Sequence, residues 1–150
     1  MADLRDLYQE VILDHYKKPR NFRKIEHANR EAEGFNPLCG DKLSVYMRIK
    51  DGVVEDIGFI GAGCAISTAS ASMMTESLKG KTEAEAKALF ERFHQLVTDH
   101  SEASPDPATL GKLAVFSGVR EYPVRVKCAT LAWHTMRAAL EGRQGTVATE

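Results

Sequence analysis

The chain has 150 residues, of which 43% are hydrophobic and 27% are charged, and its 20 basic and 21 acidic residues leave a formal net charge of −1. This length suffices for one domain with its own hydrophobic core, and the balanced charge argues against nucleic-acid binding. No apolar run approaches the roughly 20 residues that a membrane-spanning helix needs, so we expect neither a nucleic acid nor a membrane as a partner.

The N-terminal segment predicts an amphipathic helix that ends before Pro19. Asp3 is the expected N-cap. Residues 20–37 are polar and are expected to be irregular, with a turn at Asn36-Pro37 just before the first cysteine. The apolar residues of the helix recur at helical spacing: Leu4, Leu7, Tyr8, Val11, Ile12 and Tyr16.

The same N-terminal segment resembles neither a secretory signal nor a transit peptide, because acidic residues are spread along it. We therefore expect a reducing cytoplasmic location, where disulfides are rare. The three cysteines are Cys39, Cys64 and Cys128, and three thiols cannot all pair within one chain. Free thiols, a metal site and a sulfur-transfer site remain as interpretations.

A β-hairpin is predicted over residues 42–60. Apolar and polar residues alternate over 42–50, Asp51-Gly52 is a hairpin-turn dipeptide, and 53–60 is the expected returning strand. The two outer ends of an antiparallel hairpin are neighbours. Cys39, before the first strand, and Cys64, after the second, are therefore expected to lie close together.

The second half of the chain is predicted to be helical. A helix rich in small residues begins at Gly61-Ala62-Gly63-Cys64 and stops at Gly80. Thr82 and Glu85 have the spacing of a capping box that begins the next helix. The remaining expectations are a polar loop over 98–109, a short helix over 110–116, a last helix over 124–140 and a frayed tail over about 142–150, all within one domain of residues 1–150.

Three thiols and one carboxylate are the candidates for chemistry. A helix N-terminus lowers the pKa of a thiol such as Cys64, and the cations of Arg125 and Lys127 would stabilise a thiolate at Cys128. Cys39-Gly40-Asp41 places a carboxylate beside the third thiol. Together these four side chains would complete a tetrahedral shell for a thiophilic divalent metal, zinc above all, although iron accepts the same ligands.

Each of these residues also has a plainer interpretation. A cysteine at a helix start can simply be packed as a small apolar side chain, and an aspartate before a strand is common. The histidines are expected on surfaces or in satisfied polar roles, and none is placed in the site.

The cysteine motifs resemble those of a known family. The segments that carry the resemblance are Cys39-Gly40-Asp41, Gly61-Ala62-Gly63-Cys64-Ala65-Ile66-Ser67 and Arg125-Val126-Lys127-Cys128-Ala129-Thr130-Leu131. They are similar to the three cysteine motifs of the IscU-like iron–sulfur cluster assembly family, also described as the NifU N-terminal family. The scaffold branch usually has a histidine where this chain has Lys127. That difference, and a longer segment over roughly 98–121, match the SufU-type branch.

This resemblance implies an α+β fold, in which a small antiparallel β-sheet is covered by helices on one side. It implies zinc held by Cys39, Asp41, Cys64 and Cys128. It further implies zinc-dependent sulfur transfer, in which the protein accepts persulfide sulfur from a SufS-type cysteine desulfurase and serves downstream iron–sulfur assembly proteins.

By the same analogy, a histidine of the desulfurase would replace one thiolate on the zinc, and Cys39 would be the acceptor. Arg125 would steady the persulfide or help to displace Asp41. Two alternatives stay open. The first is a scaffold on which iron–sulfur clusters are assembled and passed to apo-proteins. The second is a binding module with a structural zinc.

Overall fold

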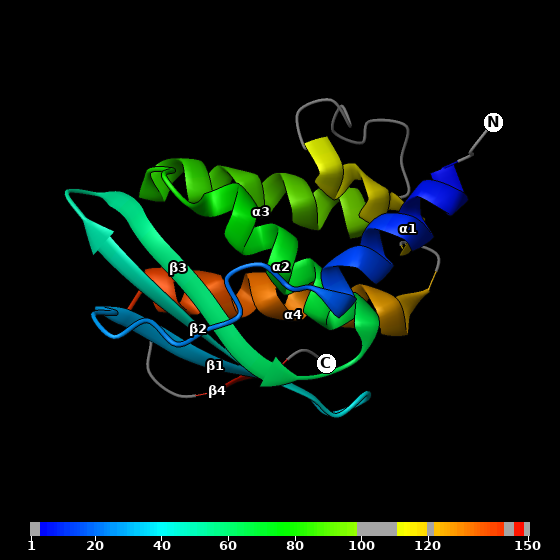
Figure 1. The fold of residues 1–150 in the computed structure, drawn as a ribbon, viewed down its shortest axis with the longest axis horizontal. Coiled ribbons are helices and arrows are strands. Elements are labelled where there is room, and N and C mark those ends of the chain that lie inside the picture. The colour runs from blue at the N-terminus through cyan, green and yellow to red at the C-terminus, as the bar shows by residue number, and fades with distance from the viewer. Residues whose placement is uncertain (1–3, 99–110, 120–121, 143–145, 149–150) are drawn as a thin grey trace.

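The structure is a computed structural model that describes residues 4–98, 111–119, 122–142 and 146–148 (Figure 1). The predicted Asp3 cap and nearly all of the predicted 98–109 loop lie outside these residues. In chain order the elements are α1 (Leu4–Lys17), β1 (Arg30–Asn36), β2 (Asp41–Lys50), β3 (Val53–Ala62), α2 (Ala65–Leu78), α3 (Glu83–Thr98), the 3-10 helix η2 (Gly111–Val119), α4 (Pro123–Leu140) and β4 (Thr146–Ala148).

The sheet has the strand order β3-β2-β1-β4, and its central part is the predicted hairpin. β2 and β3 are antiparallel, and Lys42 pairs with Ala62. Asp51 and Gly52 have φ angles of 54° and 75°, as a tight hairpin turn requires. The register confirms that the start of β2 lies beside the end of β3.

Two strands differ from the sequence-based expectation. β1 lies within residues 20–37, which were expected to be irregular. Its inward positions are Ala32, Gly34 and Asn36, so no apolar alternation marks it as a strand. β4 lies in the predicted tail and pairs in parallel with β1 at its free edge. In both cases the strand forms because it pairs with a neighbouring strand, and the local sequence does not predict that pairing.

The helices cover one face of the sheet in two layers, which confirms the predicted α+β class (Figure 1). α4 packs on β1 and β2, and α2 packs on β3, whereas α1, η2 and α3 lie on the outer side of this pair. The buried Trp133 of α4 stacks on Phe93 of α3 with ring centres 4.4 Å apart. This aromatic contact joins the two helical layers.

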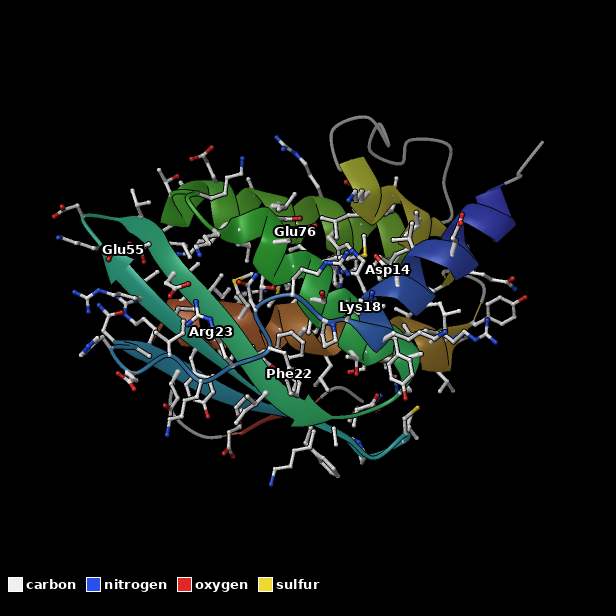
Figure 2. All side chains as sticks on the ribbon, viewed as in Figure 1. Asp14, Lys18, Phe22, Arg23, Glu55 and Glu76 are labelled. Atoms are coloured by element: carbon white, nitrogen blue, oxygen red, sulfur yellow. The ribbon has the colours of Figure 1, made fainter. Side chains whose placement is uncertain are left out.

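The chain between α1 and β1 runs along the free edge of β3. The Phe59 amide donates to the Asn21 carbonyl at 3.1 Å. Phe22 meets the Phe59 ring edge-on at 5.1 Å, and Figure 2 shows it lying against β3. This segment therefore limits how much of the edge of β3 stays open.

The helix ends follow the predicted signals. Cys64 is the N-cap of α2, and the positive φ of Gly80 follows its end. Thr82 and Glu85 make both bonds of the capping box that begins α3, each at 3.1 Å. Among the described residues, no helix combines the length and the apolar character needed to cross a membrane.

His134 provides a pH-dependent contribution to stability. It lies between α3 and α4, where its ring meets Phe90 and His94 at 5.3 and 5.6 Å. Burial is the largest of the causes that lower its pKa from 6.5 to about 4, followed by the charges of His94 and Arg137. The folded protein therefore binds fewer protons at this ring than the unfolded chain does. The stabilisation is complete above pH 6.5 and is lost as the pH falls toward 4.

We expect His134→Gln to flatten this pH dependence in metal-free protein. The full pKa shift corresponds to about 3 kcal/mol, and we expect roughly 2 kcal/mol because the ring is only partly shielded from water. Urea unfolding at pH 7 and pH 4.5 measures it, with the exposed His27→Gln as the control. An identical loss of stability in wild type and His134→Gln would contradict this account.

Candidate metal centre

The four predicted ligands come from three parts of the fold that meet at one end of the sheet. Cys39 lies in the turn between β1 and β2, and Asp41 is the first residue of β2. Cys64 immediately precedes α2, and Cys128 lies in the first turns of α4. Gly40 separates the first two ligands with a φ of 70°, a conformation that glycine adopts without strain.

Three of these residues form a compact group. The ligand atoms of Cys39, Asp41 and Cys128 all lie within 4.8 Å of one another. The Cys39 and Cys128 sulfurs are 3.2 Å apart. Cys64 approaches from the rim, with its sulfur 3.8 Å from Oδ2 of Asp41. The structure thus brings the predicted set together as a trio with a fourth thiol beside it.

Asp41 connects the group to the start of α2. It is fully buried, and its Oδ1 accepts a hydrogen bond from the backbone amide of Cys64 at 2.8 Å. Gly63 permits this contact, because a Cβ on that residue would lie 2.9 Å from Oδ1. One carboxylate oxygen thus holds the helix start, while the other faces the thiols.

The environment favours the thiolate form at Cys64. The neighbouring Cys128 thiol is the largest of the causes that lower its pKa to about 7, and the backbone amide of Ser67 also contributes. That amide lies 3.4 Å from the Cys64 sulfur, in the N-capping position of α2. Hydrogen bonding to Cys64 and burial both raise the pKa of Cys128.

Accessibility differs strongly among the three cysteines. Cys39 is exposed, Cys64 is intermediate, and Cys128 is buried with 2% of its surface accessible. Leu38, the apolar residue directly before Cys39, is 59% exposed. Tyr122 and Val124, at the start of α4, are 50% and 49% exposed.

Arg125 lies outside the compact group. It is exposed near the start of α4, and its guanidinium lies 4.7 Å from the centre of the Tyr122 ring. Among the described contacts, none joins Arg125 to the cysteines or to Asp41. The structure therefore places this predicted residue close to the site in sequence but at the surface.

Sequence reasoning missed Asn36, which it used only as a turn signal. Its side chain is fully buried, and its Nδ2 lies 3.4 Å from Oδ2 of Asp41 and 3.5 Å from the Cys128 sulfur. Its Oδ1 accepts from the amide of Leu38 at 3.3 Å. The only sequence signal was its position three residues before Cys39, and that spacing does not reveal contacts with α4.

The donor set fits a zinc ion. Zinc binds thiolates at about 2.3 Å and carboxylate oxygens at about 2.0–2.2 Å, so tetrahedral ligand atoms lie roughly 3.3–3.8 Å apart. The 3.8 Å contact between the Cys64 sulfur and Asp41 is close to the separation of about 3.5 Å expected for a sulfur–oxygen pair. Two sulfurs on one zinc lie about 3.8 Å apart, so the 3.2 Å pair of Cys39 and Cys128 would have to separate slightly. A buried carboxylate beside three thiols is also an oxygen ligand that suits a thiophilic cation.

The fold and the site together define a small α+β domain with a candidate metal centre of thiols and one carboxylate. The sequence matches the family model of the NifU-like N-terminal domain over residues 7–141, and the chain belongs to this family. The resemblance noted in the sequence is thereby confirmed.

Relatives in the family have two kinds of name. The chain is 38% identical to the zinc-dependent sulfurtransferase SufU of Bacillus subtilis, with 96% of each chain covered. It is 37% identical to the iron–sulfur cluster assembly scaffold protein IscU of Streptococcus pyogenes, over 94% of this chain and 87% of that one.

A solved structure of a relative has the same fold. The solved structure of FiSufU from Fervidobacterium islandicum superposes with a TM-score of 0.82 at 36% identity. The alignment covers 89% of this chain and 96% of that one. The fold is thus that of the IscU and SufU proteins.

Proposed function

We propose that this protein is a zinc-dependent sulfur carrier that accepts persulfide sulfur from a cysteine desulfurase during iron–sulfur cluster assembly. The observation that carries the proposal is the exposure of Cys39 beside the buried Cys128 and Asp41. Cys39 can meet a partner, Cys64 is only partly accessible, and Cys128 and Asp41 are buried. We place this chemistry in the reducing cytoplasm, where the thiols remain free.

Zinc would be held by Cys39, Asp41, Cys64 and Cys128, and when bound it would keep the thiols deprotonated and order the loops around them. The transfer itself belongs to Cys39. Its thiolate attacks the terminal sulfur of the persulfide on the desulfurase, and a new sulfur–sulfur bond forms on Cys39. The old sulfur–sulfur bond breaks, and the desulfurase cysteine leaves as a thiolate.

Leu38, beside Cys39, and Tyr122 and Val124, at the start of α4, are exposed apolar residues that support docking of a protein near the site. We propose that a SufS-type desulfurase binds here. Arg125, exposed at the start of α4, is placed to steady the anionic persulfide as it arrives. Downstream assembly proteins would then receive the sulfur.

A scaffold function is the second candidate, since the relative in Streptococcus pyogenes has that name. Metal analysis and two activity assays on purified protein separate the candidates. A sulfur carrier should contain one tightly bound zinc and should accelerate turnover of the desulfurase. A stable reconstituted iron–sulfur cluster that is passed to an apo-protein, without any effect on the desulfurase, would contradict the sulfur-carrier proposal.

A further inference from the structure

We propose that Asn36 is a positioning residue that holds Cys128 and Asp41 in the metal centre and thereby leaves Cys39 as the thiolate that is released. The inference rests on the proposed metal centre and extends it. It concerns a side chain of β1 that is itself no metal ligand.

Both polar atoms of the Asn36 carboxamide have partners. The carboxamide oxygen faces the Leu38 amide, because that amide is a donor and must meet an acceptor. The NH₂ group then points to Oδ2 of Asp41 and to the Cys128 sulfur, which both accept. The amide can hold both ligands in this way because its NH₂ group is a donor, whereas a carboxylate at position 36 would offer no donor to either.

The Asn36 side chain contributes to the turn between β1 and β2 through its oxygen alone, which accepts from the amide of Leu38 two residues on. The Gly40 amide donates to the backbone carbonyl of Asn36 at 2.8 Å, and any residue could accept that bond. The turn does not use the buried NH₂ group, whose partners are the two candidate ligands that it contacts.

The contacts are unevenly distributed over the ligands. Asn36 donates to Cys128 and Asp41, and the backbone amide of Cys64 gives Asp41 a further donor. Cys64 accepts from the amide of Ser67. Cys39 receives no hydrogen bond from Asn36, whose oxygen instead holds the amide of the preceding Leu38. Removal of the carboxamide should weaken retention of Cys128 most, because Asp41 keeps its second donor.

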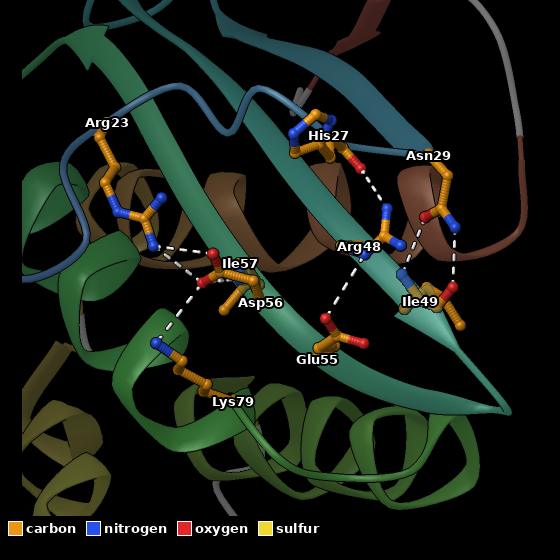
Figure 3. Close-up of polar contacts among 9 residues, drawn as sticks. All are labelled: Arg23, His27, Asn29, Arg48, Ile49, Glu55, Asp56, Ile57 and Lys79. Atoms are coloured by element: carbon orange, nitrogen blue, oxygen red, sulfur yellow. Dashed lines mark hydrogen bonds and ion pairs between the residues drawn. The ribbon is translucent and has the colours of Figure 1, made fainter.

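The experiment compares Asn36→Ala with the control Asn29→Ala, both loaded with one equivalent of zinc. Asn29 bonds β2 with both ends of its carboxamide, at 2.7 and 2.8 Å from the backbone of Ile49 (Figure 3). Ile49 lies near the hairpin turn, about 26 Å along the strand from Asp41. The control thus removes an equivalent set of bonds at the other end of β2.

Two readouts are measured: zinc affinity, by competition with a chromogenic chelator, and the iodoacetamide modification rate of each cysteine, by mass spectrometry. We expect Asn36→Ala to lower zinc affinity by about 10–100-fold, as loss of a residue that orients metal ligands typically does. Modification of Cys128 should rise at least about tenfold, whereas wild type and Asn29→Ala should be modified mainly at Cys39.

Wild-type affinity together with wild-type order of modification in Asn36→Ala would overturn the inference. If circular dichroism shows that Asn36→Ala does not fold, Asn36→Asp is tested in its place, because it keeps the shape of the side chain and removes the donors. The same two outcomes apply. Failure of wild type to bind zinc would instead overturn the proposed metal centre. The two failures are therefore distinguishable.

Discussion

Replacement of Cys39 by serine is expected to abolish uptake of persulfide sulfur from the desulfurase. Cys39 is the exposed thiol of the group, and a serine hydroxyl is not ionised at neutral pH and cannot act as the sulfur nucleophile. Intact-protein mass spectrometry after incubation with desulfurase and free cysteine detects each added sulfur atom. We expect a fall of at least about tenfold in the persulfidated fraction.

The matched control is Cys64→Ser, which also removes one thiolate from the metal centre but retains the proposed acceptor. Both variants weaken zinc binding, so uptake is compared at equal zinc content. Residual uptake in Cys64→Ser with none in Cys39→Ser supports the assignment. Full uptake by Cys39→Ser would refute Cys39 as the acceptor.

Removal of the metal is expected to lower the melting temperature by about 10 °C. The site connects the β1–β2 turn, the start of α2 and the start of α4, so bound zinc stabilises only the folded chain. Zinc at 1,000 times its dissociation constant contributes about 4 kcal/mol. One kcal/mol corresponds to about 2–4 °C for a domain of this size.

Calorimetry before and after chelation, with metal loss verified by elemental analysis, measures the change. We expect the metal-free protein to melt cooperatively, because its core around Trp133 and Phe93 does not include the site. Complete unfolding on chelation would favour a purely structural zinc. An unchanged melting curve after verified metal loss would contradict the metal centre.

The elements with local signals were predictable from the sequence. The alternation that ends at Asp51-Gly52, the stop at Gly80 and the capping box at Thr82 all depend on neighbouring residues, and the structure confirms them. β1 was not predictable in this way. Its inward side chains are small or polar because α4 packs closely on it, and a Cβ on Gly34 would lie 2.0 Å from Oγ1 of Thr135.

Only the part of the site that lies at the ends of the hairpin strands was predictable from the sequence. The hairpin brings the Cys39 and Cys64 segments together, whereas the approach of Cys128 depends on how α4 crosses the sheet. The roles of Asn36 and of the two oxygens of Asp41 arise only from that packing. Motif spacing therefore predicted which residues are candidates for the site, but it did not predict the hydrogen bonds that hold them.

X-ray absorption at the zinc edge, on protein purified without added metal, tests the central claim most directly. We expect one zinc per chain with three sulfur ligands at about 2.3 Å and one oxygen ligand at about 2.0–2.2 Å. Asp41→Ala should change the oxygen shell and leave the three sulfurs. A zinc shell with fewer than three sulfurs, or protein that contains no thiolate-bound metal, would contradict the claim that Cys39, Cys64, Cys128 and Asp41 bind one ion.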